Sequence, residues 1–169
     1  MDKILEKLNI LEQEVSKLRK NPRLPDHFHN GFDVSRINYS DIYQKKFYVY
    51  HTIQGTAAAT AANYGTFFIV PFTCVLTKFQ EVHQTAGTDG GTVSVDLEKL
   101  TGTTAPDSGV SMLSSALSLK ATINTVQTAT LTTTNSNRNL AVGDRLCLKD
   151  AGVLTTVANV TVMAELLIT

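Results

Sequence analysis

The chain has 169 residues and a mass of 18.4 kDa, which is room for one ordinary domain and a short appendage. Apolar residues make up 43% of it, enough for a core, and its two cysteines are too few for the disulfide scaffold of a small secreted protein. Fifteen basic and fifteen acidic residues cancel, and no apolar run is long enough to span a membrane, so we expect neither nucleic-acid binding nor membrane insertion.

The charges divide the chain into two parts. Residues 1–50 hold nine Lys or Arg and seven Asp or Glu, which is 16 of the 30 charged side chains in less than a third of the sequence. Such density is typical of an elongated segment wrapped by solvent, whereas the poorly charged remainder is typical of a compact domain. We therefore expect a stalk over residues 1–20, an extended connector over 21–45 and a head over 46–169.

Residues 1–20 have a heptad pattern, in which apolar side chains alternate at spacings of three and four. The a positions are Met1, Leu8 and Val15, and the d positions are Ile4, Leu11 and Leu18. The period of 3.5 residues is that of a left-handed coiled coil. No Gly or Pro interrupts the pattern before Asn21-Pro22, where we expect the helix to end.

Charged residues beside this seam favour association between chains. Lys7 at a g position faces Glu12 at the next e position of a neighbouring chain, and Glu14 faces Arg19 in the same way. The seam suits two or three strands, and a single helix packed on its own domain is the alternative. A coiled coil of fewer than three heptads is only marginally stable by itself. We therefore expect the rest of the chain to contribute to a homo-oligomer, which we take to be a trimer.

Two histidines stand close together in the connector. His27 and His29 lie two residues apart before the turn-forming Asn30-Gly31, so extended backbone would point both imidazoles to one side. Two ligands on one chain make a poor metal site, but three chains on a threefold axis would supply six. That set suits one iron or other divalent ion per trimer. The alternative is that the imidazoles hydrogen-bond the neighbouring backbone and shape the turn.

The connector resembles a motif of tailed-bacteriophage proteins. The matching residues are Asp26 to Gly31, Ser35 to Ile37, and Asp41-Ile42. They are similar to the His-x-His-(Asp/Asn)-Gly…Ser…Ile…Asp-Ile connector of many phage fibre and virion-surface proteins, although Phe28 takes the place of the usual Thr or Ser. The resemblance implies a trimeric stalk joined to a following domain. It also implies an iron site of the kind that His-x-His elements form in some phage fibres.

From residue 46 onward the sequence is typical of antiparallel β-structure. Apolar and polar residues alternate in 47–52, 92–98 and 157–168, as in strands with one buried face. Further strands, separated by Gly, Asn and Asp turns, are expected at 65–70, 72–83, 110–120, 125–133 and 145–149. About eight short strands predict a mainly β protein whose head is an antiparallel, jelly-roll-like β-sandwich.

The head also resembles a β-sandwich module of phage structural proteins. The resemblance is carried by the separated stretches 63–72, 81–89, 98–106, 143–146 and 150–152. Proteins with this module are mostly capsid-surface, head-fibre or tail components without known catalytic residues. The resemblance implies a non-enzymatic virion-surface protein, assembled in the host cytoplasm, whose partners are its own copies and other capsid or tail proteins.

Residues that carry chemistry are sparse in the head. The sequence contains no nucleophile elbow, no zinc-protease helix and no phosphate loop. Asp96 and Glu98 share a strand face, but we expect an exposed strand edge with neighbouring acids rather than a catalytic pair. Cys74 and Cys147 lie in apolar strands, where buried free thiols are expected and a disulfide is the alternative. We predict no enzymatic activity.

The sequence is compatible with two locations on a virion, the head and the tail, and with one further function. A head fibre or capsid-decoration protein is favoured over a host-binding tail fibre, because the chain is short and its coiled coil starts at the first residue, leaving no large domain for tail attachment. The alternative from another class is a carbohydrate-binding adhesin for host-surface glycans. Its stacking platforms would be Tyr48, Tyr50 or Tyr64, each expected to be exposed.

Overall fold

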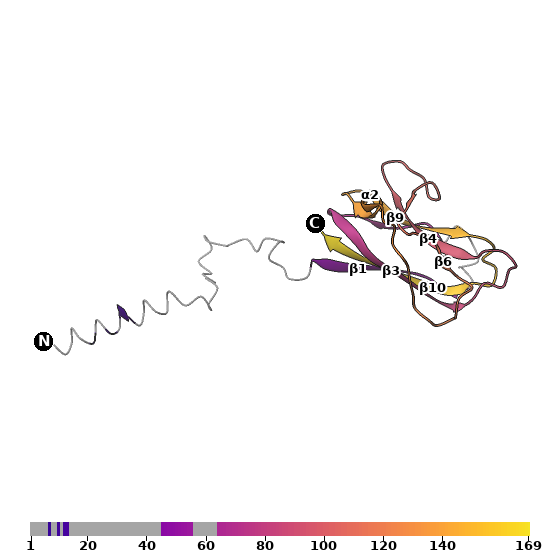
Figure 1. Cartoon of the computed structure of the whole chain (residues 1–169), viewed down its shortest axis with the longest axis horizontal. Helices are drawn as coiled ribbons and strands as arrows, with labels where there is room; N and C mark the ends of the chain where they lie inside the picture. The colour runs from indigo at the N-terminus through magenta and orange to yellow at the C-terminus, as the bar shows by residue number, and fades with distance from the viewer. Residues whose placement is uncertain (1–6, 8–9, 11, 14–44, 56–63) are drawn as a thin grey trace. The chain divides into compact units, whose positions relative to one another are not determined.

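A computed structural model of the chain describes residues 7, 10, 12–13, 45–55 and 64–169 (Figure 1). The chain divides into two compact units, Met1–Asp41 and Ile42–Thr169. In the first unit, the four described residues are all helical and exposed, which agrees with the helix expected over 1–20. The coiled coil itself needs neighbouring chains and stays a prediction.

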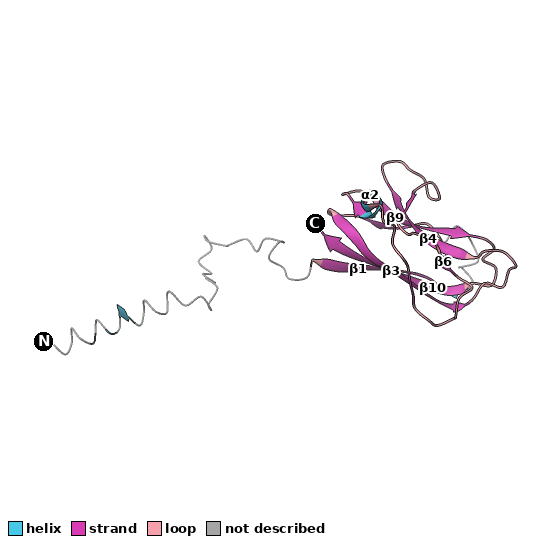
Figure 2. Cartoon of the chain, in the orientation of Figure 1, coloured by secondary structure: helices cyan, strands magenta, loops and turns pink. Residues whose placement is uncertain are grey.

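The second unit is built from antiparallel strands (Figure 2). In chain order they are β1 (Lys46–Ile53), β2 (Thr66–Ile69), β3 (Cys74–Thr85), β4 (Ser94–Leu100), β5 (Val110–Ser111), β6 (Leu117–Ser118), β7 (Gln127–Thr128), β8 (Asn139–Leu140), β9 (Arg145–Ala151) and β10 (Ala158–Ile168). The helix α2 (Asn135–Arg138) has four residues and immediately precedes β8.

Strands from opposite ends of this unit pair with each other. One sheet, sheet A, has the order β1-β10-β3-β7, with β8 also paired to β3. The other, sheet B, has the order β2-β9-β4-β5, with β6 also paired to β4. Every pairing between these strands is antiparallel. The first strand therefore lies beside the last and the second beside the ninth, as in a long hairpin wrapped around a core. The predicted mainly β, antiparallel architecture is confirmed.

Both sheets contribute side chains to one hydrophobic core. Leu76 and Phe79 of sheet A and Leu97 and Leu148 of sheet B belong to it, and all four are fully buried. The alternation of residues along each strand decides which side chains reach this core. In β1, for example, every second residue is exposed, starting with Lys46, as the pattern in 47–52 predicts.

A bulge in β3 changes which of its residues face the core. Its partner β10 pairs Leu166 with Leu76 and Glu165 with Lys78, so Thr77 is an extra residue. The buried positions of β3 are therefore even-numbered before the bulge and odd-numbered after it. The Thr77 hydroxyl donates hydrogen bonds to the main-chain oxygen of Glu165 at 3.1 Å and to its carboxylate at 2.7 Å. These bonds hold the extra residue in place.

The expectation of long strands at 110–120 and 125–133 is wrong. The structure has only the two-residue strands β5, β6 and β7 there, together with one isolated antiparallel bridge between Leu113 and Leu131. The Ser111 hydroxyl donates to the carbonyl oxygen of Leu113 at 3.1 Å and accepts from its N–H at 3.2 Å. Serine side chains compete with neighbouring strands for backbone groups in this way, so the segment bends. The other predicted strands end within two residues of the expected positions.

Candidate functional site

The predicted metal ligands and most of the predicted stalk contacts lie outside the described residues. These are His27 and His29, the heptad residues Ile4, Leu8, Leu11, Val15 and Leu18, and the ion-pair residues Glu14 and Arg19. The residues of the other expected ion pair, Lys7 and Glu12, are exposed helical residues. Within the described ranges, no group of three or more His, Cys, Asp or Glu side chains could hold a metal ion. No helix of those ranges is long and apolar enough to cross a membrane.

The two cysteines are buried free thiols on different sheets. Cys74 begins β3 of sheet A, and Cys147 lies in β9 of sheet B, as expected of cysteines in apolar strands. Burial raises the pKa of Cys74 to about 11 and also raises the pKa of Cys147. Both thiols therefore stay protonated at neutral pH and are poor nucleophiles.

Asp96 and Glu98 share one face of β4, but the expectation that this face is an exposed edge is wrong. β4 lies between β9 and the short strands β5 and β6, and the Glu98 side chain is only 2% exposed. Its carboxylate is 3.2 Å from Lys149 Nζ and accepts a hydrogen bond from Gly109 N at 3.3 Å. Asp96 accepts one from the Ser111 hydroxyl at 3.0 Å. Both carboxylates thus hold the chain around β5 onto sheet B.

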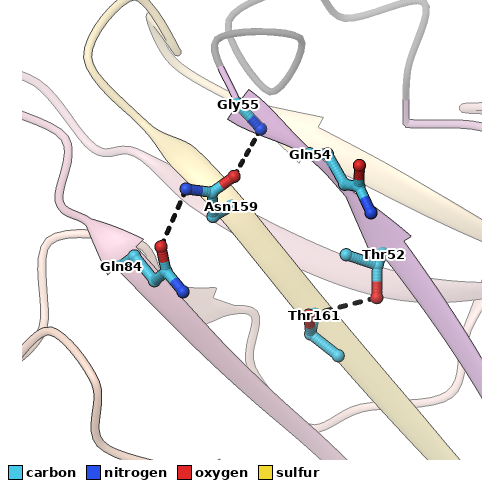
Figure 3. Close-up of a pocket in the computed structure, with 6 residues that line it drawn as sticks. All are labelled: Thr52, Gln54, Gly55, Gln84, Asn159 and Thr161. Atoms are coloured by element: carbon cyan, nitrogen blue, oxygen red, sulfur yellow. Dashed lines mark hydrogen bonds between the residues drawn. The ribbon is translucent and has the colours of Figure 1, made fainter.

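A polar cleft opens where β1 and β3 end and β10 begins. Its volume is about 520 Å³. Its lining consists of hydroxyl and amide side chains together with one glycine, namely Thr52, Gln54, Gly55, Gln84, Asn159 and Thr161 (Figure 3). None of the six residues is charged. We call this site the amide cleft.

Asn159 connects the two sides of the amide cleft. Its side-chain oxygen accepts a hydrogen bond from Gly55 N, and its side-chain nitrogen donates to Gln84 Oε1 at 2.8 Å (Figure 3). Asn159 has a φ of 53°, a left-handed conformation that asparagine adopts more readily than most residues. Its amide thereby ties the chain that follows β1 to the end of β3, across β10.

Several polar groups of the amide cleft are open to a ligand. The hydroxyls of Thr52 and Thr161 are 3.1 Å apart and share one hydrogen bond, which leaves one hydroxyl proton without an acceptor among the described residues. Within the same ranges, Gln84 uses its side-chain oxygen but not its nitrogen. The Gln54 amide has no hydrogen-bond partner among the described residues. The cleft can therefore both donate and accept hydrogen bonds without rearranging.

Two exposed tyrosines extend from the cleft along β1. Tyr50 is 66% exposed and Tyr48 is 51% exposed, and strand alternation puts both on the same face of sheet A as Thr52. Tyr50 lies two residues from Thr52, roughly 7 Å along the strand.

The expectation that Tyr64 is a third exposed stacking platform is wrong. It is 4% exposed and belongs to the hydrophobic core. Burial raises its pKa well above the ordinary value, and its hydroxyl has no hydrogen-bond partner among the described residues. The aromatic ring is part of the hydrophobic core, so it offers no surface for a sugar.

A second polar cluster is buried on the inner face of β3. Glu81 and His83 have fully buried side chains, and His83 Nδ1 lies 2.9 Å from Glu81 Oε1. His83 Nε2 is 3.2 Å from the carbonyl oxygen of Ala121. Gln127 Nε2 donates to Glu81 Oε2 and, at 2.8 Å, to the carbonyl oxygen of Ser118. The polar groups of the pair hold β7 and the chain before it against β3, so this cluster is structural.

Sequence analysis missed both polar clusters, for different reasons. The alternation in 157–168 correctly placed Asn159 and Thr161 on the polar face of their strand. These two residues lie beside Thr52 and Gln84 because β10 pairs with both β1 and β3. No sequence motif indicates that pairing. The inward direction of the buried pair depends on the bulge in β3, and its only sequence signal is a Glu and a His two residues apart in an apolar strand.

Comparison with known proteins gives a likeness of fold. No protein-family model matches the chain, and no curated protein matches it. Among solved structures, a chain of the capsid of Ralstonia phage GP4 matches with a TM-score of 0.56 and 13% sequence identity, over 73% of this chain and 84% of that chain. A chain of the capsid asymmetric unit of cyanophage Pam1 matches over the same shares with a TM-score of 0.48 and 14% identity.

Proposed function

We propose that this chain is a non-enzymatic structural component of a bacteriophage virion, a trimeric head fibre or capsid-decoration protein exposed on the particle surface. The observation that carries the proposal is the fold shared with a chain of the Ralstonia phage GP4 capsid, over 84% of that chain. The connector and head motifs of the sequence point to the same class of protein. Other virion proteins are then its partners, and the host cytoplasm is where it assembles.

The head of the proposed protein is a jelly-roll-like β-sandwich. The strand orders of sheets A and B support this, because the pairing of the first strand with the last and of the second with the ninth is what a wrapped hairpin produces. The hydrophobic core to which both sheets contribute supports it as well. A packed domain of this kind presents stable surfaces to neighbouring proteins.

The stalk of the proposed protein joins three chains. The heptads of residues 1–20 support a coiled coil, and three connectors would bring together six imidazoles from His27 and His29. We propose that these hold one iron or other divalent ion per trimer. Three heads on one axis would bind neighbouring virion proteins with avidity, because three weak contacts act together.

Locating the protein on particles tests the virion role. Antibodies raised against residues 64–169 are expected to label the heads of intact particles of the phage that encodes the chain. The chain is also expected in purified particles at a fixed ratio to the capsid protein. Label on the tails would favour the second candidate function below, and absence of the chain from purified particles would refute the virion role.

The metal proposal has its own measurement. Elemental analysis of the purified full chain is expected to find about one divalent ion per three chains. The variant His27→Ala/His29→Ala should lose that ion, whereas His51→Ala, a histidine of β1, should keep it. Metal-free wild-type protein, or metal retained by the double variant, would contradict the site.

A tail-fibre receptor-binding protein or a carbohydrate-binding adhesin for the host surface is the second candidate function. The observation that favours it is the pair of exposed rings, Tyr48 and Tyr50, beside the uncharged amide cleft. Exposed aromatic rings next to amide groups are suited to glycans, because the rings stack on sugars while the amides bond their hydroxyls. Binding of the full chain to a glycan array would support this function.

A further inference from the structure

We infer that the amide cleft and the ring of Tyr50 form one binding site for a neutral oligosaccharide. The inference rests on the second candidate function, for which it names the site and the class of ligand. It does not depend on whether the protein stands on the head or the tail of a particle.

The absence of charge in the cleft selects a neutral ligand. All six lining residues are uncharged. The charged residues on this face of sheet A lie toward the opposite end of β10, where Glu165 is ion-paired with Lys46 at 2.9 Å and stands beside Lys78. A phosphate, a sulfate or the carboxylate of an acidic sugar would find no cation in the cleft to offset the loss of its hydration. A metal ion would find no carboxylate or imidazole there.

The open hydrogen-bonding groups match the hydroxyls of a sugar. A hydroxyl both donates and accepts, and so does a side-chain amide, which presents the two functions side by side. The amide of Gln54 is entirely free among the described residues, and Gln84 has a free side-chain nitrogen. Asn159 is held in place by its own two hydrogen bonds. The lining is therefore partly fixed before a ligand arrives, which reduces the entropy cost of binding.

Tyr50 provides the apolar half of the site. It is 66% exposed, lies on the same face as Thr52, and is directly opposite Met163 on β10. An exposed ring beside an amide-lined cleft offers the C–H face of a sugar ring a stacking surface while its hydroxyls reach the amides. Tyr48 continues the surface along β1, so that a ligand of several sugar units would contact both rings. A peptide strand would instead be expected at the outer edge of β1, which pairs only with β10 among the described strands.

The test uses the full chain and two cleft variants. The wild-type protein is first applied to an array that carries neutral and acidic oligosaccharides, and affinity for the best neutral binder is then measured by isothermal titration calorimetry. Tyr50→Ala is expected to weaken binding about fivefold to tenfold through loss of stacking. Gln54→Ala should weaken it about fivefold through loss of hydrogen bonds. The matched control is Gln80→Ala, an amide of the same face outside the cleft, which should leave affinity unchanged within about twofold.

Each other outcome overturns the inference. Neutral-glycan binding that survives both Tyr50→Ala and Gln54→Ala would leave the adhesin function standing but remove this site from it. Binding restricted to acidic glycans, or to immobilised peptides, would refute the ligand class. A complete lack of binding would remove the site together with the second candidate function. The virion role is decided separately by the labelling of particles.

Discussion

The imidazole Nδ1 of His83 lies 2.9 Å from the carboxylate Oε1 of Glu81, and both side chains are fully buried. Its other nitrogen, Nε2, faces the carbonyl oxygen of Ala121, which can only accept a hydrogen bond, so Nε2 carries a proton. One further proton then lies between Nδ1 and Oε1, and the pair is neutral as a unit. Burial raises the pKa of Glu81, and its hydrogen bonds with His83 and Gln127 counteract only part of that effect.

Removing one partner of this pair is expected to cost more stability than replacing the carboxyl group of Glu81 by an amide. His83→Leu leaves the carboxyl group of Glu81 buried without its main partner and should lower the free energy of unfolding by about 3 kcal/mol. Glu81→Gln keeps the size of the side chain and can still hydrogen-bond both His83 and Gln127, so about 1 kcal/mol is expected. Urea denaturation measures both values. Equal losses in the two variants would show that the pairing of the groups is unimportant.

Glu165 is expected to make the free energy of unfolding decrease as the pH falls. Hydrogen bonds from the Thr77 hydroxyl and the Lys46 ammonium group hold the pKa of Glu165 below its ordinary value of 4.5. A carboxyl group whose pKa is lower in the folded state stabilises the fold above its unfolded-state pKa. That contribution is lost as the pH falls through the folded-state pKa.

The variant Glu165→Gln should therefore be less stable than the wild type at about pH 7, and the difference should be smaller at about pH 3. Urea denaturation of both proteins at each pH measures the difference, and the comparison cancels the titration of all other carboxyl groups. The variant Asp89→Asn, at a half-buried bend position, is the control. A difference for Glu165→Gln that stays constant between the two pH values would rule out this interpretation.

The direction of side chains in the long strands could be predicted from the sequence, and their pairing could not. Period-two alternation correctly predicts that Tyr48 and Tyr50 are exposed and that Val95 and Leu97 are buried. The order of the strands depends on contacts between distant parts of the chain, such as β1 with β10, which one sequence does not encode as a local signal. The amide cleft is formed by those contacts, so its residues were predictable singly but not as a site.

The features that the sequence misses or predicts wrongly have local physical causes. The extra residue Thr77 reverses the inward direction of the rest of β3 and thereby buries Glu81 and His83. The hydroxyl of Ser111 replaces a neighbouring strand as hydrogen-bond partner and ends β5. Tyr64 stands next to Gly65 in a sequence typical of a turn, yet its ring fills the core. In each case a side chain or one inserted residue overrides the regular pattern.

Two glycines with the same φ provide a matched test of close packing. Gly143 and Gly152 both have a φ of 86°, where any side chain is strained. A Cβ at Gly143 would meet no atom within 4 Å, whereas a Cβ at Gly152 would overlap the carbonyl oxygen of Thr92. Gly143→Ala is expected to lower the free energy of unfolding by about 1 kcal/mol. Gly152→Ala should cost about 4 kcal/mol, because the chain before β4 must move away. Urea denaturation measures the free energy of unfolding of both variants. Similar losses in the two would mean that the backbone at Thr92 moves away from the added Cβ at little cost.

The predicted stalk offers a matched pair of substitutions within one helical turn. Leu11 occupies a d position of the heptads, whereas its neighbour Ile10, which is 56% exposed in the helix, lies at a c position outside the seam. Leu11→Asp would place three carboxylates together at the centre of a trimer and is expected to yield monomers. Ile10→Asp introduces the same charge and should leave the trimer intact. Sedimentation equilibrium of the full chains at micromolar concentration measures the mass of each assembly. A trimer that survives Leu11→Asp would refute the predicted stalk. So would a wild-type chain that is monomeric or dimeric.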